Sequence, residues 1–198
     1  MSLREQKKLE TRQNISHAAT RLFIKRGFEV VTIADVAEAA RVAKMTVTNH
    51  FGRKEDLVFD IRNDFVDWPV NLVLADPSVT PFAAVRRGYF AALEERSALL
   101  GFAGIEFVRM VRESATLVSA LAQMHIDRER ALVAELVELD RRDEILPRAA
   151  GAHLTSVLRL LFDDVWDLTY AGVEPDALAS KVHTAATKAF AQLEPALG

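Results

Sequence analysis

The chain contains no cysteine, which excludes disulfide bonds, thiolate metal sites and redox sensing through thiols. It has no apolar run close to the roughly 18 residues that a helix needs to cross a bilayer. Residues 2–12 are mostly polar or charged, so the amino terminus lacks the hydrophobic core of a signal peptide. These absences predict a soluble cytoplasmic protein.

Motifs of catalysis are also missing. The sequence has no glycine-rich phosphate loop and no Gly-x-Ser-x-Gly turn. Asp163 and Asp164 are adjacent carboxylates, but neighbouring residues on a helix point about 100° apart and do not easily share a site. The five histidines, which are His17, His50, His125, His153 and His183, follow no metal-binding spacing. We therefore predict that the chain is not an enzyme and holds neither a metal nor a cofactor.

Helical periodicity dominates the residues that are present. Half of the 198 residues are hydrophobic, which is enough to bury the core of a small head and a larger body. No segment alternates for long as a strand does. Proline is found at 69, 77 and 81 but does not interrupt residues 82–146, which we expect to hold three helices. The predicted fold class is all-α.

Residues 32–57 show the pattern of two short helices joined by a tight turn and followed by another helix. Thr32 can cap the first short helix, with Asp35 as the acidic partner of a capping box. The second short helix is expected over Lys44–His50, and the next is expected to begin near Lys54 and to connect head and body. A longer helix should precede them, over about residues 4–26. This arrangement is a helix-turn-helix of the kind that reads DNA.

The charge distribution favours the same interpretation. Residues 1–54 contain 11 Lys and Arg against five Asp and Glu, a balance of +6 in a chain whose net charge is −3. Because cationic side chains neutralise phosphates, a positive module on an acidic body is typical of a DNA-binding domain. A solvated basic helix would have the same charge count, and the adjoining helix-turn-helix favours DNA binding over it.

A set of residues of different chemistry recurs at fixed offsets in the first sixty or so residues: Arg12, Ile15, Ala18, Ala19, Leu22, Phe23, Gly27, Phe28, Thr32, Val36, Ala37, Val42, Thr46, His50, Phe51, Lys54, Glu55 and Leu57. In order and spacing they resemble the N-terminal domain of the TetR (tetracycline-repressor) family of bacterial transcriptional regulators. The resemblance implies a helix-turn-helix domain over residues 1–54 and a helical effector-binding and dimerisation domain over residues 55–198.

Three positions depart from the family pattern. The family usually has Gly where this chain has Arg41, in a turn where a left-handed backbone costs a residue with a Cβ about 1 kcal/mol. It usually has Ser at Ala43 and an aromatic residue at Thr48. We expect a somewhat strained turn, a recognition helix without a side-chain cap, and a smaller residue at one DNA-facing position.

The recognition helix supplies most of the predicted DNA contacts. Lys44 and Thr46 can reach bases or phosphates, and Asn49 can bind an adenine edge or a phosphate. Val47 and Phe51 are expected in the core instead. The residues predicted to contact DNA are Thr32, Lys44, Met45, Thr46, Thr48, Asn49, His50 and Lys54. The alternative for each of them is a solvated helix face.

The last two helices carry apolar stripes. One helix follows Pro147 and stops near Gly172, and another begins at Pro175. The stripes consist of Leu154, Leu158, Leu161, Val165 and Leu168, and of Leu178, Val182, Ala185, Ala189 and Leu193. With a symmetry mate they would form a four-helix dimer interface, as the resemblance also implies. The alternative is that both stripes face the chain's own core; DNA recognition favours the dimer, because one short helix reads only a half-site.

Aromatic and methionine side chains of the body are candidates for a small-molecule pocket. They are Trp68, Phe102, Phe107, Met110, Met124, His125, Phe162, Trp166 and Tyr170. His125, Arg109, Asp163 and Asp164 could supply its polar contacts. The alternative is ordinary core packing.

These features predict a homodimeric, DNA-binding transcriptional regulator that binds a palindromic operator and is released by a small molecule. Its two recognition helices would enter successive major grooves about 34 Å apart. Repression is the sign that the resemblance implies, while activation stays open, as do the effector and the operator. The alternative is an adaptor that uses its helix-turn-helix for protein contacts, which would not require a basic head.

Overall fold

The structure, a computed structural model, describes residues 2–141 and 145–198. These residues form nine α-helices and two short 3-10 helices, and no strand occurs among them. The elements are α1 (Leu3–Arg26), α2 (Ile33–Ala40), α3 (Lys44–His50), η1 (Glu55–Leu57), α4 (Arg62–Ala75), α5 (Pro81–Glu94), η2 (Ala98–Leu100), α6 (Ile105–Arg112), α7 (Ala115–Leu139), α8 (Leu146–Tyr170) and α9 (Pro175–Leu197). The all-α prediction is confirmed. None of the described helices is both long and apolar enough to span a membrane.

The chain divides into two compact units. The head unit contains residues 1–62 together with 109–120, and the body unit contains residues 63–108 and 121–198. The chain therefore passes between the units three times, after Arg62 and within α6 and α7. The expected boundary after residue 54 lies earlier than this division, and the contribution of residues 109–120 to the head unit was not expected.

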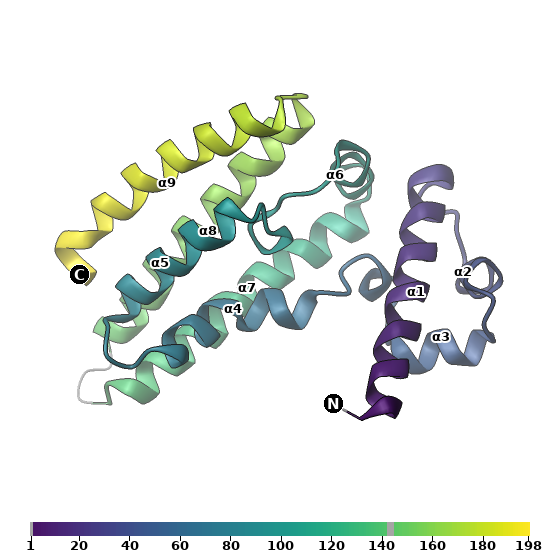
Figure 1. Cartoon of the computed structure of the whole chain (residues 1–198), viewed down its shortest axis with the longest axis horizontal. Helices are drawn as coiled ribbons and strands as arrows, with labels where there is room; N and C mark the ends of the chain where they lie inside the picture. The colour runs from purple at the N-terminus through teal and green to yellow at the C-terminus, as the bar shows by residue number, and fades with distance from the viewer. Residues whose placement is uncertain (1, 142–144) are drawn as a thin grey trace. The chain divides into compact units, whose positions relative to one another are not determined.

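In the head unit, capping and turn residues set where the helices begin and end. Gly27 ends α1 with φ +88°, and Thr32 caps α2 in the predicted capping box with Asp35. Arg41 follows α2 in the left-handed conformation, with φ 56°, as its position in the turn predicted. α2 packs against α1, and α3 packs against α2 (Figure 1). The recognition helix α3 has the predicted bounds.

The helix expected to begin near Lys54 was predicted incorrectly. Only the short 3-10 helix η1 follows Lys54, and α4 begins at Arg62. The hydroxyl of Ser16, on α1, donates to the carbonyl of Leu57 at 3.1 Å. The guanidinium of Arg12, also on α1, donates to the Asp60 carbonyl at 3.5 Å, so α1 contacts this segment at two carbonyls before α4 begins.

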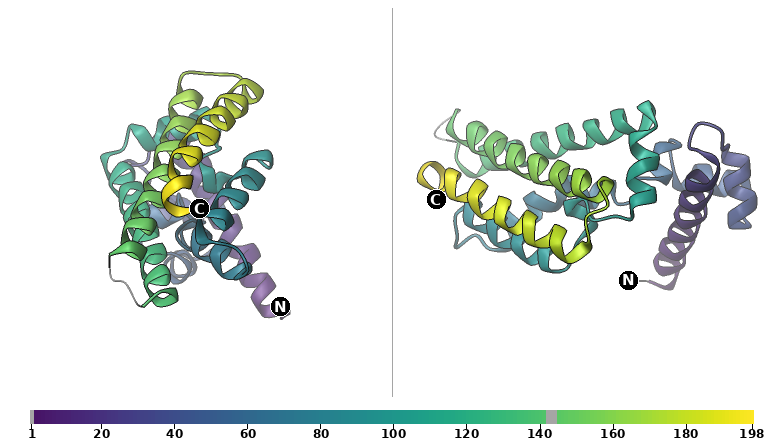
Figure 2. Two further views of the ribbon diagram at one scale, coloured as in Figure 1. Left: turned by 90° about the vertical axis from the view of Figure 1, so that its left-hand side faces the viewer. Right: turned by 90° about the horizontal axis from the view of Figure 1, so that it is seen from above.

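In the body unit, α8 and α9 lie side by side in both views of Figure 2. The stripes predicted for the dimer interface lie mainly in the body unit's own core, which corrects that prediction. Six of the residues are at most 4% exposed, namely Leu154, Leu158, Leu161, Val165, Leu178 and Val182. The reason is that each stripe meets neighbouring helices of the same chain. Leu168, Ala185 and Ala189 are half-buried, and their part in an interface stays a prediction.

A buried cation links three elements of the body unit. Pro69 lies inside α4 and has no N–H to donate to the carbonyl of Phe65, four residues earlier. Arg128 of α7, which is 1% exposed, supplies the missing donor: its Nε lies 2.9 Å from that carbonyl oxygen. Its Nη2 donates to the Leu99 carbonyl at 3.2 Å, and its guanidinium lies 3.3 Å from the centroid of the Phe65 ring. Burial lowers the pKa of Arg128 to about 9, so the side chain stays charged at neutral pH.

Candidate DNA-binding surface and body cavity

The recognition helix α3 has one buried side and one open side. Val47 is fully buried and Phe51, which follows the helix, is 4% exposed, as predicted for core residues. Lys44, Thr48 and Asn49 are exposed, together with Met45 at 69%. Thr46 and His50 are half-buried. The predicted contact residues of α3 therefore lie mainly on its solvent side.

Thr48 offers an apolar surface despite its hydroxyl. Its Oγ1 donates to the Met45 carbonyl at 3.1 Å, within the helix. This bond leaves the methyl group of Thr48 as the part available to a partner. Together with the exposed Met45 side chain, the methyl group suits contact with a thymine methyl in the major groove.

Arg12 anchors the end of α3. Its guanidinium donates to the carbonyls of His50 and Asp60 and lies 4.2 Å from the centroid of the Phe51 ring. Burial, followed by the charges of Lys8 and Arg12, lowers the pKa of His50. A neutral imidazole still has one N–H with which to donate to a phosphate oxygen. The sequence pattern contained Arg12 but did not reveal this positioning role, since its acceptors lie 38 and 48 residues away.

Thr32 and Lys54 have structural partners within the head unit. The Thr32 amide donates to Oδ2 of Asp35 at 2.8 Å, so this amide already has a hydrogen-bond acceptor within the head unit. The Lys54 ammonium donates to the carbonyls of Phe28 and Glu29 and lies 4.3 Å from the Phe28 ring centroid. Lys54 is followed by the three-residue η1 and not by the longer helix that was expected to begin near it. The contacts of Thr32 and Lys54 with DNA stay predictions, and these internal hydrogen bonds would have to be exchanged for bonds to DNA.

Some of the residues predicted to bind ligand meet in one aromatic cluster of the body unit. The Phe162 ring centroid lies 5.0 Å from that of His125, 5.2 Å from Trp166 and 5.7 Å from Phe65. Phe107 contacts Trp166 at 6.4 Å. A Cβ added to Gly101 would lie 2.9 Å from Trp166, so this cluster is closely packed. The edge-to-face geometry of most pairs favours the core interpretation.

The other candidates lie apart from these ring contacts. Met124 is 2% exposed, Trp68 and Phe102 are half-buried, and Tyr170 is 47% exposed. Met110 and Arg109 belong to the head unit, which corrects their placement in a body pocket. Asp163 is exposed and Asp164 is half-buried. The predicted set is therefore spread over core, surface and head unit.

His125 should make stability sensitive to acid. Burial, followed by the charges of Arg128 and Arg159, lowers its pKa from 6.5 to about 3, and its Nε2 is buried with no hydrogen-bond partner. The unfolded chain takes up this proton near pH 6.5, whereas the folded chain does not, so stability is full above that pH and falls toward pH 3. We expect about 2 kcal/mol to be lost through His125 between about pH 7 and pH 5.

Urea unfolding of the wild type and of His125→Phe at several pH values measures this contribution. The variant should lose that part of the pH dependence. His153→Gln replaces an exposed histidine and is the control. It should keep the wild-type dependence of the free energy of unfolding on pH. If the free energy of unfolding depends on pH equally in the wild type and in His125→Phe, a group other than His125 causes that dependence.

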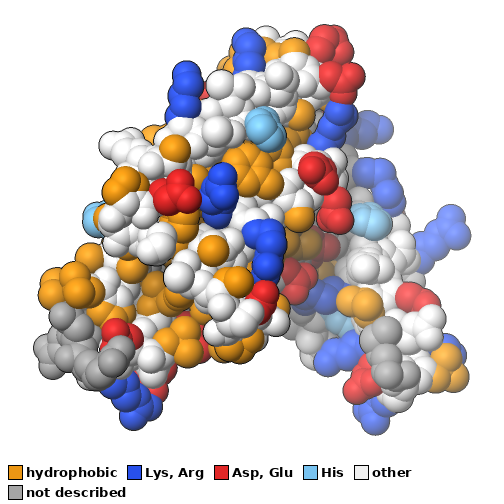
Figure 3. Space-filling model, turned by 60° about the vertical axis from the view of Figure 1, so that its left-hand side comes forward, with side chains coloured by type: hydrophobic (Ala, Val, Ile, Leu, Met, Phe, Trp, Pro, Cys, Tyr) orange, Lys and Arg blue, Asp and Glu red, His pale blue; other side chains and the backbone are white. Residues whose placement is uncertain are grey.

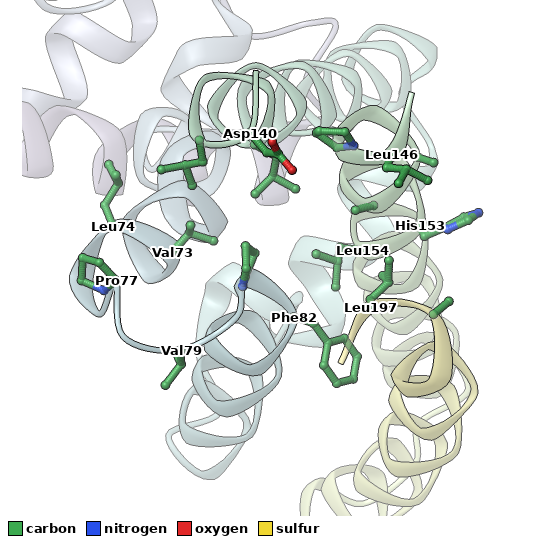
Figure 4. A pocket seen from close by; sticks show the side chains of 17 residues that line it. Val73, Leu74, Pro77, Val79, Phe82, Asp140, Leu146, His153, Leu154 and Leu197 are labelled. Atoms are coloured by element: carbon green, nitrogen blue, oxygen red, sulfur yellow. The ribbon is translucent and has the colours of Figure 1, made fainter. Parts of the chain in front are cut away.

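The body unit also contains a cavity of about 590 Å³. The ends of α4, α5, α7, α8 and α9 surround it (Figure 4). Val73 and Leu154 point toward one another across it, and Phe82 and Leu197 lie at its base in this view. None of the nine predicted ligand residues is among those that line it. The sequence does not reveal this cavity, because its lining is largely aliphatic and has the pattern of ordinary helix cores.

Comparison with known proteins identifies the head unit. Residues 15–61 match the sequence profile described as bacterial regulatory proteins, tetR family. The HTH-type transcriptional regulator TcmR of Streptomyces glaucescens is 30% identical over 96 residues, which are 48% of this chain and 34% of TcmR. The HTH-type transcriptional repressor KstR2 of Mycolicibacterium smegmatis is 32% identical over 57 residues, 29% of this chain and 28% of KstR2.

Residues 15–61 of this chain are therefore similar to the N-terminal region of TetR-family regulators. The chain spans only about a third of the curated relatives it matches, 34% of TcmR and 28% of KstR2. The structure of NalD, the secondary repressor of the MexAB-OprM multidrug efflux pump in Pseudomonas aeruginosa, is 21% identical and covers 91% of this chain and 96% of its own, with a TM-score of 0.57. At that identity the likeness shows the fold. The family and these relatives are transcriptional regulators, in agreement with the prediction that the chain is not an enzyme.

One departure of this chain from the TetR-family pattern leaves α3 without a side-chain cap. Ala43 occupies the N-cap position without a side-chain hydrogen bond. Ala43→Ser should raise the free energy of unfolding by about 1 kcal/mol, because its hydroxyl can accept from a free amide of the first turn. Urea denaturation measures the gain. Ala43→Val, which adds a side chain without an acceptor at this exposed position, is the control and should gain no stability. Equal stability of the two variants would contradict a capping effect.

Proposed function

We propose that this chain is a TetR-family transcriptional repressor that binds a near-palindromic operator as a homodimer and is released by a small molecule. The observation that carries the proposal is the open side of α3, where Lys44, Met45, Thr48 and Asn49 are exposed. Residues 1–54, to which this helix belongs, have a formal net charge of +6. Because its proposed partner is duplex DNA, it would act in the cytoplasm.

The four exposed side chains match the chemistry of a major groove. Asn49 can bind the N6 and N7 edge of adenine with two hydrogen bonds. Met45 and the methyl group of Thr48 suit thymine methyl groups, and the Lys44 ammonium suits a phosphate or a guanine edge. Arg12 holds the end of α3 in place, since its guanidinium donates to the carbonyl of His50. The repressive sign is supported by KstR2, a transcriptional repressor that is 32% identical to this chain over 57 residues.

Dimerisation follows from the length of α3. A helix of seven residues reads only a half-site, so useful affinity requires a second copy at the next major groove, about 34 Å away. The core stripes of α8 and α9 are not available for that purpose, and the outer faces of these helices are. Leu160 and Tyr170 of α8 are 58% and 47% exposed, and we place them in the interface beside the half-buried Leu168, Ala185 and Ala189.

Release by a ligand requires two states with different affinity for DNA. A molecule bound in the body unit would act through the segments shared with the head unit, which are the start of α4 and helices α6 and α7. In the head unit, the Ser114 hydroxyl donates to Glu29 at 2.7 Å and joins the start of α7 to the turn before α2. A ligand that bound both states equally would change nothing.

Selection of bound duplexes from a random DNA pool, followed by titration of the winner at several salt concentrations, tests the proposal. A near-palindromic winner with steep inverse salt dependence is expected, since each neutralised phosphate releases counterions. If no sequence is enriched and binding is weak even at low salt, the helix-turn-helix is a protein-contact scaffold, and the adaptor alternative holds instead.

A further inference from the structure

We infer that the first turns of α1 form a second DNA-contacting surface, in which Arg4 and Lys8 bind backbone phosphates beside the one that His50 can bind. The inference rests on the proposed function, since it adds a contact with the same duplex. It gives a role in binding to α1, which lies outside the helix-turn-helix and for which the sequence predicted no DNA contact.

One face of α1 changes from apolar to cationic along the helix. Its apolar part consists of three fully buried residues of the head unit, Ile15, Ala19 and Phe23. Toward the start of the helix the same stripe continues through Arg12, Lys8 and Arg4, at steps of three, four and four residues. Residues 2–10 are all exposed. The face that forms core further along the helix is therefore open at its start, where it carries positive charge.

Two observations place this cationic row beside the end of the recognition helix. The guanidinium of Arg12 donates to the carbonyl of His50, the last residue of α3. One turn earlier on α1, the charge of Lys8 is, after burial, the largest cause that lowers the pKa of His50. The first turns of α1 extend past α3 (Figure 1). A phosphate bound by His50 would therefore lie close to the Lys8 ammonium, which would attract it.

Arg4 and Lys8 are free to bind an external anion. Within residues 2–141 and 145–198, neither side chain forms a hydrogen bond or an ion pair. The acids nearest in sequence have other partners: Glu5 accepts from the Ser2 amide at 2.7 Å, and Glu10 accepts from a glutamine one turn earlier at 3.2 Å. Several other cations of the head unit already have internal acceptors, namely Arg12, Arg26, Arg53 and Lys54.

The shape of the row suits a polyanion. A helix rises about 6 Å over four residues, so the two free charges follow one another along α1. The capping box of Ser2 with Glu5 holds this first turn as helix. Lys and Arg side chains project from the head unit in the space-filling view (Figure 3). Because the row passes the end of the helix proposed for the major groove, the phosphates that border that groove are its nearest anions.

Fluorescence anisotropy of the full chain with two labelled duplexes tests this surface. One duplex is the operator selected from the random pool, and the other is an unrelated sequence of the same length. The test variant combines Arg4→Gln with Lys8→Gln. The matched control combines Arg21→Gln with Lys25→Gln, which removes the same two residue types from exposed positions of α1 outside the row. Both variants have the same net charge, and circular dichroism establishes that both are folded.

We expect the test variant to bind both duplexes at least about tenfold more weakly than the control at about 0.1 M salt. For the operator, the slope of the logarithm of the binding constant against the logarithm of salt should fall by about 3–4 per dimer, since four phosphate contacts are lost. The preference for the operator over the unrelated duplex should not change, because phosphates carry no base information. Equal affinities and slopes of the test variant and the control would overturn the inference and leave the row as a solvated face. A loss confined to the operator would overturn it as well.

Single methylphosphonates, which replace one charged phosphate by a neutral group, locate the contact on the operator. At one or two positions in each half-site, this replacement should weaken binding of the wild type and have no further effect on the test variant. If every position affects both proteins equally, Arg4 and Lys8 do not bind phosphates and the inference fails.

The unrelated duplex separates this inference from the proposed function. If an operator is selected and the two double variants bind it alike, the inference fails and the proposed function stands. If no operator is selected, but the unrelated duplex binds at low salt and the test variant loses this binding, the proposed function fails and the inference stands. If the wild type binds neither duplex, both fail.

Discussion

Replacing Arg128 by Met is expected to lower the free energy of unfolding by about 2–4 kcal/mol. The guanidinium donates to the buried carbonyls of Phe65 and Leu99 and lies over the Phe65 ring, and its loss leaves both carbonyls without this donor. Relief from burying a charge opposes this cost. The unmade bonds should prevail, because Pro69 leaves the Phe65 carbonyl without its usual helical donor.

Pro69→Ala provides a specific rescue. The new Ala amide can donate to the Phe65 carbonyl, so in the Arg128→Met background it should recover about 1–2 kcal/mol. In the wild-type background the same change should have a smaller effect, since Arg128 already serves that carbonyl. Urea denaturation of the four proteins gives the coupling free energy between the two positions.

Two controls accompany this cycle. Arg128→Lys keeps the charge but cannot donate through a fork to two carbonyls, so it should remain less stable than the wild type. Arg159→Met removes an exposed arginine from α8 and should change the stability little. If Pro69→Ala has the same effect in both backgrounds, Arg128 does not compensate for the proline.

Asn49→Ala is expected to reduce the affinity of the dimer for its operator by about 30-fold to 10⁴-fold. A base contact contributes about 1–3 kcal/mol, and a homodimer loses two contacts at once. Lys44→Ala should act differently if its ammonium binds a phosphate. It should weaken binding to all sequences and reduce the slope of the logarithm of the binding constant against salt by about two per dimer.

Lys25→Ala is the matched control for charge. It removes one positive charge from the last turn of α1, outside the recognition helix. Fluorescence anisotropy with the selected operator, at several salt concentrations, measures all three variants, and their thermal unfolding shows that the head unit is folded. Unchanged operator binding by folded Asn49→Ala and Lys44→Ala would remove α3 from the DNA interface.

The bounds of most helices follow from local signals. The box of Thr32 with Asp35 begins α2, Gly27 ends α1, and Pro175 begins α9. These signals act within a few residues, so the sequence predicts them without knowledge of distant segments. The core positions of α3 could be predicted for the same reason, since a helix of seven residues has one apolar side.

The break after Lys54 could not be predicted in this way. Leu57 and Val58 are buried and fit a helical pattern, yet Ser16 of α1 binds the Leu57 carbonyl and the segment turns. The bond of Arg128 to the Phe65 carbonyl likewise depends on Pro69, which lies 59 residues before Arg128 in the chain. Polar contacts over such separations exist only after the helices have packed.

The sequence by itself determined the all-α fold, the helix-turn-helix and its basic charge, because caps, periodicity and composition are local properties. Only the tertiary structure decided which apolar faces are covered. Leu158 and Val182 lie on stripes that suit either a core or a dimer, and packing within the chain placed them in the core. It likewise left an aliphatic hollow between helix ends, since the volume between elements depends on how they pack and not on the periodicity of any one of them.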